Sequence, residues 1–318
     1  MIYNGYAVDL LPLLCYNTPK VVSFMRKFIL GTDWWTDCDD AVALRLLTRA
    51  VKEKKIKLLG IALNACMEYS VASLKGFLKA DGITEEIPVG IDRAATDFGG
   101  KPSYQKRLAT NHAPSLTNEN AEDALKLYRR LLSESKEKLE LMEIGYLQVI
   151  SSLLKSGPDE ICEKSGLELV REKVSKIWVM AGKWDAEGEK ENNFCRNERS
   201  RIAAKEFCEL CPVPVTFLGW EVGFGVISGG KLSKSDHLYD VLCDYGSVNG
   251  RHSWDPMLVM MALIGNEKEA GYGKVTGHAR VDEKSGANYF EKDADGKHSF
   301  VVKLHPNSYY EEQINQSL

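Results

Sequence analysis

Residues 27–47 read KFILGTDWWTDCDDAVALRLL, which is an apolar run, an acidic segment and then a helical pattern. The apolar run Lys27–Gly31 is typical of a strand that is buried on both faces. Across residues 40–51 the apolar side chains recur at three-to-four spacing, which predicts a helix that packs through one face. The segment is therefore predicted to be a strand, a loop rich in carboxylates, and a helix.

The same order of strand and helix repeats through the first two thirds of the chain. Further apolar, β-branched runs predict strands at Ile56–Leu63, Ile87–Ile91, Leu139–Ile144, Lys176–Ala181 and Pro214–Leu218. Helical spacing predicts helices at Tyr69–Ala80, Glu119–Ser133, Leu147–Leu154 and Asn197–Leu210. This alternation predicts an α/β fold with an open, mostly parallel sheet and helices on both faces. In such sheets, ligands bind outside the carboxyl ends of the strands.

The last third has a different pattern. Trp254–Ile264 is predicted to be another apolar helix. Alternating runs then predict strands at Lys274–Val281, Asn288–Glu291 and His298–Leu304. Gly-containing turns between these runs predict a small antiparallel hairpin region on the same core. We expect one α/β domain over residues 26–318, preceded by an N-terminal extension, residues 1–25, that fits no pattern.

The composition excludes several classes of protein. The chain has 318 residues, of which 44% are hydrophobic, and a net charge of −4 with scattered Lys and Arg, which argues against a nucleic-acid binder. No run of about 18 apolar residues predicts a membrane span, and no basic segment precedes the apolar N-terminal patch as it would in a secretory signal. Eight cysteines are too dilute for a disulfide scaffold. We expect a cytoplasmic protein.

Four carboxylates, Asp33, Asp37, Asp39 and Asp40, lie within eight residues of one another directly after the first predicted strand. Like charges this close are costly unless a cation compensates them. Capping of the following helix explains two of the four but not the whole set. Oxygen ligands are those that calcium and magnesium prefer. The segment therefore predicts a metal site at the carboxyl end of the strand.

These residues also carry a resemblance to a known family. The pattern DxxxDxDDA that begins at Asp33 resembles the N-terminal signature of the calcium-dependent nucleoside hydrolases, in the branch whose loop is two residues longer. Further segments agree with that family in order and approximate spacing: Met142–Gly145, Val179–Gly182, Glu191–Phe194, Leu218–Gly223 and Arg251–Pro256. Each motif alone is modest, but the ordered set is specific and covers about residues 27–265.

The resemblance implies a calcium-dependent hydrolysis of the N-glycosidic bond of ribonucleosides, with an oxocarbenium-like transition state. Ca²⁺ would be held by Asp33, Asp40, the carbonyl of Ile144 and Asp255, and Asp33 would also act as the general base toward a calcium-bound water. Asp37 is an extra carboxylate with two open roles, either to support a metal ligand or to cap the helix.

The resemblance also implies which residues bind the ribose. Asp39 would accept a hydrogen bond from one ribose hydroxyl, and Glu191, Asn192 and Asn193 would hold the others. Asn192 stands where many relatives have an aromatic residue.

The kind of base that leaves is inferred from a residue that differs from the family pattern. Trp254 stands where many relatives have a histidine that protonates the base. Relatives with Trp at that position stack purines between aromatic rings, so we expect purine or modified purine ribonucleosides as substrates. Trp35 and Trp220 are candidates for the second ring, and each could instead be a packing residue. His252 is an alternative proton donor.

Two other functions stay open at this point. One is a non-catalytic, calcium-dependent protein that binds nucleosides or ribose, and the other is a hydrolase of a different ribosyl compound. The resemblance suggests a homodimer or a homotetramer that acts on a small-molecule ribonucleoside.

Overall fold

The computed structural model describes residues 25–35, 37–100 and 102–318. The predicted N-terminal extension lies outside these residues except for Met25. Among the described residues, no helix has the length and apolar character needed to cross a bilayer.

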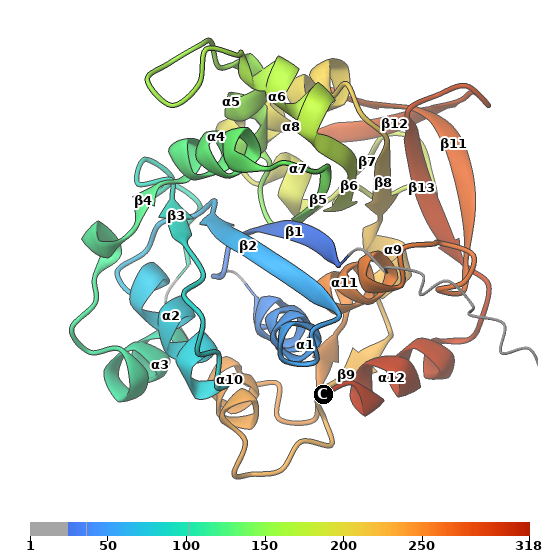
Figure 1. The fold of residues 1–318 in the computed structure, drawn as a ribbon. Helices are drawn as coiled ribbons and strands as arrows, with labels where there is room; N and C mark the ends of the chain where they lie inside the picture. Colours follow the sequence, from blue (N-terminus) through green and yellow to red (C-terminus); the bar gives the residue numbers. More distant parts are fainter. Residues whose placement is uncertain (1–24, 36, 101) are drawn as a thin grey trace, which may run out of the picture.

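One central sheet organises the molecule (Figure 1). Its strands in chain order are β1 (Arg26–Thr32), β2 (Ile56–Leu63), β3 (Val89–Ile91), β4 (Glu122–Asp123), β5 (Leu139–Glu143), β6 (Val174–Met180), β7 (Glu189–Lys190), β8 (Val215–Leu218), β11 (Tyr272–Val281), β12 (Ala287–Lys292) and β13 (His298–Lys303). Their order across the sheet is β4-β3-β2-β1-β5-β6-β8-β13-β11-β12-β7. All pairings from β4 to β13 are parallel, and those beyond β13 are antiparallel. The predicted α/β fold is confirmed.

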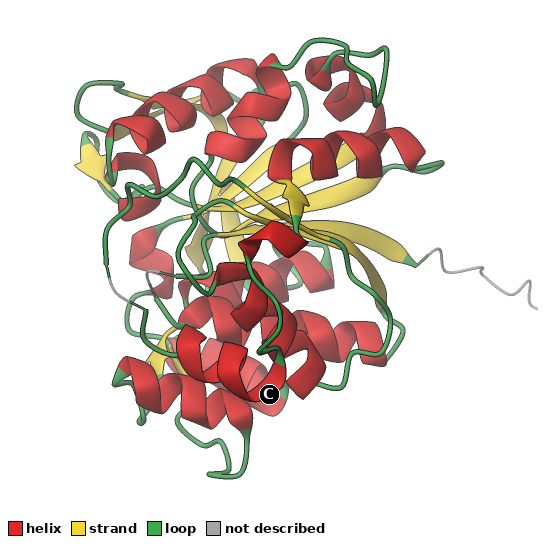
Figure 2. Cartoon of the chain, turned by 90° about the vertical axis from the view of Figure 1, so that its left-hand side faces the viewer, coloured by secondary structure: helices red, strands yellow, loops and turns green. Residues whose placement is uncertain are grey.

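Helices cover both faces of the sheet (Figures 1 and 2). On one face lie α4 (Ala124–Glu134), α5 (Gln148–Lys155), α6 (Gly166–Lys173) and α8 (Glu198–Leu210). On the other face lie α1 (Asp39–Lys52), α2 (Ser70–Ala80), α3 (Gln105–His112), α10 (His237–Tyr245), α11 (Trp254–Ile264) and α12 (Asn307–Gln316). Short elements complete the described chain: η1 (Asn118–Asn120), α7 (Asn192–Cys195), α9 (Trp220–Gly223) and the paired strands β9 (Ile227–Ser228) and β10 (Arg251–His252).

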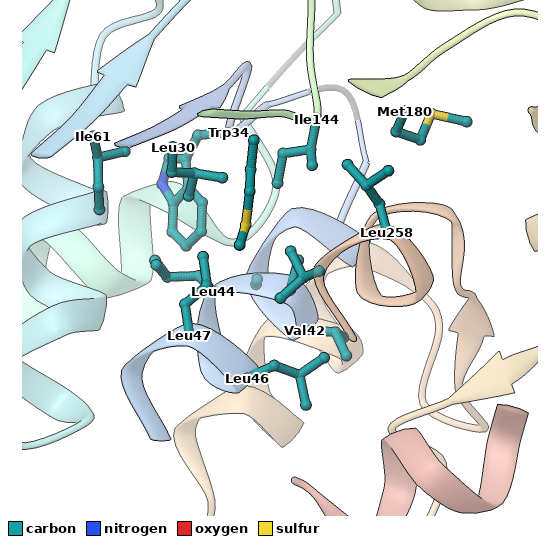
Figure 3. Packing of buried hydrophobic residues seen from close by; sticks show 14 of the residues in the cluster. Leu30, Trp34, Val42, Leu44, Leu46, Leu47, Ile61, Ile144, Met180 and Leu258 are labelled. Carbon is teal, nitrogen blue, oxygen red and sulfur yellow. The ribbon is translucent and has the colours of Figure 1, made fainter. Parts of the chain in front are cut away.

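The hydrophobic core is divided by the sheet into two large clusters. Leu30 of β1, Leu44 of α1 and Leu258 of α11 belong to the cluster that Figure 3 shows. Burial of each such side chain contributes about 1.5–3 kcal/mol to folding. Because α1 and α11 pack side by side on the same face, their N-terminal ends meet at the carboxyl edge of the sheet.

The helices α3, α6, α10 and α12 were not predicted from the sequence, and two predicted elements differ in extent or pairing. The helix predicted to begin at Glu119 begins at Ala124, because Asn118–Asn120 forms a 3₁₀ turn and Asp123 accepts a hydrogen bond from the backbone N–H of Lys126 (3.0 Å). The hairpin region at the C-terminal end is antiparallel as predicted, but it extends the central sheet. Its strand β13 pairs in parallel with β8.

Candidate functional site

A cavity of about 320 Å³ opens at the carboxyl edge of the central strands. Its wall is formed by residues that follow β1, β5, β7 and β8, by the ends of β6 and α10, and by the first turns of α1 and α11. All the site residues predicted from the sequence line this cavity except Trp35: Asp33, Asp39, Asp40, Ile144, Glu191, Asn192, Asn193, Trp220, Trp254 and Asp255. The parallel sheet thus brings together residues that are far apart in the chain.

Three buried carboxylates meet where α1 and α11 begin. Asp39 and Asp40 lie in the first turn of α1 and Asp255 lies in the first turn of α11. One carboxylate oxygen from each lies within 4.8 Å of the others. The backbone N–H of Asp255 donates to Asp39 Oδ2 (3.1 Å), which ties the two helix ends together.

The electrostatics of this group favour a cation. Burial, followed by the charge of neighbouring carboxylates, raises the pKa of Asp39, Asp40 and Asp255 well above the usual range. The Thr32 hydroxyl and the backbone N–H of Trp34 donate to Asp40 and offset part of this cost. A hard divalent ion would offset more, and carboxylate oxygens are the donors that such an ion prefers. The residues present therefore fit a divalent cation.

Asp33 and Ile144 lie on the wall of the same cavity. Asp33 follows β1, its side chain is buried, and its Oδ1 accepts a hydrogen bond from the backbone N–H of Trp35 (3.0 Å). Ile144 follows β5, the neighbour of β1 in the sheet. The ligands predicted from the sequence were Asp33, Asp40, the Ile144 carbonyl and Asp255. The described carboxylates whose oxygens lie within 4.8 Å of one another are those of Asp39, Asp40 and Asp255, so this group contains Asp39 and not Asp33.

Asp37 forms an ion pair with Arg251, whose Nε donates to Asp37 Oδ1 (2.8 Å). This hydrogen bond raises the pKa of the Arg251 guanidinium above its ordinary value. Asp37 does little to cap α1. The N-cap residue, Cys38, makes no side-chain cap hydrogen bond. Among the described residues at that helix end, only the backbone N–H of Cys38 donates to Asp37 Oδ1. The principal partner of Asp37 is therefore an arginine that is 214 positions away in the chain.

Glu191, Asn192 and Asn193 form a polar wall of the cavity. Glu191 accepts hydrogen bonds from the backbone N–H groups of Gly182 and Asn193, both at 2.9 Å. Burial raises the pKa of Glu191 to about 7, although these two donors lower it. The side-chain amide of Asn193 donates to the carbonyl of Met180 (2.9 Å), so its carbonyl oxygen is the part of the amide that can accept from a ligand.

Trp220 and Trp254 form an aromatic wall of the cavity. Trp220 lies in α9 and Trp254 at the start of α11, with ring centroids 6.3 Å apart and an angle of 29° between the rings. Trp254 Nε1 donates to the Trp220 carbonyl (2.7 Å), which fixes the indole in place. Phe224 stacks on Trp220 at 4.6 Å.

Trp35 and His252 lie elsewhere. Trp35 belongs to a small buried cluster that contains Phe98 and Tyr146, so its observed contacts are those of a packing residue. His252 is not on the cavity wall, and its Nδ1 accepts a hydrogen bond from the backbone N–H of Gly225 (2.9 Å). Burial lowers the pKa of His252 below its ordinary value.

Five further residues belong to the site or support it and were not predicted as site residues. Met180, Arg196, Tyr245 and Arg251 line the cavity. Asn64 is buried, and its side-chain oxygen accepts from the backbone N–H of Tyr146 (3.1 Å). A polar residue directly after β2 was a usable signal for Asn64, whereas Tyr245 lies in α10, which the sequence pattern did not reveal.

Comparisons with known proteins find the same fold in solved structures, two of which are nucleoside hydrolases. No family model matches the chain, and no curated protein sequence matches it. Among solved structures, an inosine-uridine preferring nucleoside hydrolase from Bacillus anthracis has a TM-score of 0.64 at 15% identity, covering 92% of this chain and 100% of that one. A purine-preferring ribonucleoside hydrolase from Gardnerella vaginalis has a TM-score of 0.67 at 16% identity, covering 91% of this chain and 96% of that one.

A third similar structure is the type III effector protein XopQ complexed with adenosine diphosphate ribose. Its TM-score is 0.63 at 14% identity, and the match covers 92% of this chain and 93% of that one. At these identities the likeness shows a shared fold over nearly the whole length of each chain.

Proposed function

We propose that this protein hydrolyses the N-glycosidic bond of purine or modified purine ribonucleosides, giving free base and ribose. One observation carries the proposal: the buried carboxylates of α1 and α11 share a single cavity with a polar wall and an aromatic wall. Carboxylates, amides and stacked rings are, respectively, the groups that an attacking water, ribose hydroxyls and a purine require. The fold shared with two ribonucleoside hydrolases supports the same chemistry.

The acidic group is proposed to bind Ca²⁺ through Asp39, Asp40 and Asp255, with Asp33 and the carbonyl of Ile144 on the same wall as further candidate ligands. Bound there, the ion would polarise water and the ribose diol. Asp33 would take the proton from the attacking water, because its buried carboxylate is oriented by the backbone N–H of Trp35.

The polar wall is proposed to orient the sugar. Asp39 and Glu191 would accept hydrogen bonds from ribose hydroxyls, and Asn192 and Asn193 would complete the set. Because Glu191 and Asn193 are already fixed by backbone partners, they cost little reorganisation when the substrate binds. A buried polar wall of this kind also disfavours substrates that lack a hydroxyl, since one of its groups would then be left without a partner.

The aromatic wall is proposed to hold the base. A purine stacked on Trp254 or Trp220 gains roughly 1–3 kcal/mol, by analogy with bases on aromatic platforms. Trp254 is fixed by its hydrogen bond to the Trp220 carbonyl, so the ring is oriented before the base arrives.

A second candidate function is the hydrolysis of another ribosyl compound. The specific observation in its favour is that XopQ, which shares the fold, was solved with adenosine diphosphate ribose. A protein that only binds its ligand would have the same cavity, so turnover of the substrate distinguishes such a protein from either kind of hydrolase.

The test is a panel of purine, pyrimidine and modified ribonucleosides, with the full chain assayed for released ribose in the presence and absence of a calcium chelator. We expect ribose from purine members of the panel and its loss on chelation. Binding of the same compounds without any ribose would instead establish the non-catalytic alternative.

A further inference from the structure

Arg196 places a positive charge in the wall of the cavity. It directly follows α7, and its backbone N–H donates to the Asn192 carbonyl (3.0 Å), so it stands one helical turn beyond the start of the polar wall. Its Nε donates to the carbonyl of Phe98 (2.8 Å). That bond fixes the plane of the guanidinium, while its two terminal nitrogens make no hydrogen bond to any residue in the described ranges.

The charges around the cavity leave Arg196 without a counter-ion. Arg251, which also lines the wall, is paired with Asp37. Asp39, Asp40 and Asp255 form the candidate cation group. Within residues 25–35, 37–100 and 102–318, no carboxylate lies at ion-pair distance from Arg196. The guanidinium is exposed to solvent at the cavity wall, and its two terminal nitrogens, held in one plane by the bond to Phe98, match the paired oxygens of a phosphate group.

The position of Arg196 assigns the phosphate to the sugar. Glu191, Asn192 and Asn193, which are proposed to hold ribose hydroxyls, belong to the same short segment of chain as Arg196. The aromatic rings proposed to hold the base come from α9 and α11. An anionic group bound by Arg196 would therefore extend from the ribose and not from the base.

We propose that Arg196 binds a phosphate group on the sugar, so that the protein prefers phosphorylated ribosyl compounds, such as nucleoside 5′-monophosphates, to neutral nucleosides. In the reaction, water forms a bond to C1′, the bond from C1′ to the base nitrogen breaks, the water's proton passes through the enzyme to the base, and the products are free base and ribose 5-phosphate. This inference rests on the proposed function, whose substrate class it extends from ribonucleosides to their phosphorylated forms.

The test compares kcat/KM for matched pairs, adenosine with AMP and inosine with IMP, in the full chain and in two variants. Arg196→Gln removes the charge at the cavity. Arg199→Gln removes a nearby arginine of α8 whose partner is Asp97 outside the cavity, and serves as the control. A third pair, uridine with orotidine, places the negative charge on the base.

We expect wild type and Arg199→Gln to favour each monophosphate by about 10-fold to 100-fold, as a charge-assisted contact to phosphate would give. Arg196→Gln should reduce that ratio to about one while its kcat/KM for the neutral nucleoside stays within about 3-fold of wild type. A ratio near one in wild type, or an unchanged ratio in Arg196→Gln, would overturn the inference. Preference for orotidine that depends on Arg196 would also overturn it, because the charge would then lie on the base.

A binding measurement separates failure of this inference from failure of the proposed function. If no compound is hydrolysed, the proposed function fails, and calorimetric titration of ribose 5-phosphate and ribose still tests Arg196. At least about 10-fold tighter binding of ribose 5-phosphate, lost in Arg196→Gln, would support the subsite. Equal binding of the two sugars would refute it.

Discussion

The carboxylate of Asp33 is 3% exposed and is oriented by the backbone N–H of Trp35 at 3.0 Å. A carboxylate fixed on the cavity wall can accept a proton from water without reorganisation, and such general-base catalysis contributes about 10²–10⁴-fold to rate. We therefore expect Asp33→Ala to lower ribose release by at least about 100-fold while the circular dichroism spectrum stays that of the folded protein.

The matched control is Asp295→Ala, which removes an exposed aspartate from the turn between β12 and β13. It should release ribose at the wild-type rate. Activity retained in Asp33→Ala would remove Asp33 from the role of general base.

Trp254 is expected to act on the leaving base. Loss of its ring should matter most for a purine, whose departure needs stacking and a proton, and least for a nitrophenyl riboside, whose leaving group needs neither. Trp254→Ala should therefore lower kcat/KM for purine nucleosides roughly 10-fold to 100-fold more than for the nitrophenyl riboside. Trp35→Phe, a change in the small buried cluster away from the cavity wall, should affect both substrates alike. Equal losses on the two substrates in Trp254→Ala would reject stacking.

Glu191 gives the site a dependence on pH. Burial raises its pKa to about 7 from an ordinary value of 4.5, so the neutral form predominates below pH 7 and the carboxylate above it. Both oxygens of Glu191 accept backbone hydrogen bonds, so protonation would turn one of these acceptors into a donor, and kcat/KM is expected to fall as the pH drops through about 7. Glu191→Gln should have lower activity and lack this limb of the profile. The same limb in the Gln variant would assign the titration to a different group.

At the scale of elements, β1, β2 and β5 converge tightly where the site begins. A Cβ added at Gly145 would lie 2.4 Å from the backbone nitrogen of Asp33 and 2.7 Å from the side-chain oxygen of Asn64. Gly145→Ala must therefore displace the backbone that carries Asp33. We expect a loss of about 1–3 kcal/mol in the free energy of unfolding, measured by denaturant titration, together with lower ribose release.

Gly157→Ala provides the control, because no atom lies within 4 Å of a Cβ built at Gly157. It should leave stability unchanged or raise it by up to about 1 kcal/mol. Gly145→Ala with wild-type stability and activity would show that the strand ends are not constrained as the structure indicates.

Elements with strong local signals could be predicted from the sequence, and elements set by long-range contacts could not. The apolar run Lys27–Gly31 forms β1 as expected, and Trp254–Ile264 forms α11 with the predicted bounds. No local sequence pattern predicts the parallel pairing of β13 with β8, because this pairing joins strands that are far apart in the chain. Short helices such as α7 and α9 contain too few residues for a periodic pattern.

The same division holds within the site. Acidic residues directly after a predicted strand indicated Asp33, Asp39 and Asp40, since a parallel sheet gathers such positions at one edge. The pairing of Asp37 with Arg251 could not be predicted, because it joins segments 214 positions apart. Trp35 and Trp220 were both candidates for the second ring because each was predicted to lie on a loop at a strand end, but Trp220 lines the cavity and Trp35 packs in a small buried cluster with Phe98 and Tyr146.

For the molecule as a whole, the proposed cation would link α1 to α11 and so stabilise the folded state. The carboxylates of Asp39, Asp40 and Asp255 repel one another when ionised, and an ion that binds only the folded chain removes that cost. At 100 times its dissociation constant such an ion adds about 2.7 kcal/mol, which corresponds to a rise in Tm of roughly 3–8 °C.

Thermal unfolding of the metal-stripped full chain, with and without added CaCl₂, measures this rise. It should be absent in Asp255→Asn and retained in Asp295→Asn, which changes only an exposed turn. A Tm that rises equally in Asp255→Asn would place the calcium elsewhere.

The most direct test of the account is ribose release from a purine ribonucleoside by the metal-stripped chain while CaCl₂ is added back. We predict no release before calcium is added, and a rate that rises to saturation as one ion binds per chain. An undiminished rate in the stripped protein, with chelator still present, would contradict the claim that the carboxylates of α1 and α11 hold the ion on which hydrolysis depends.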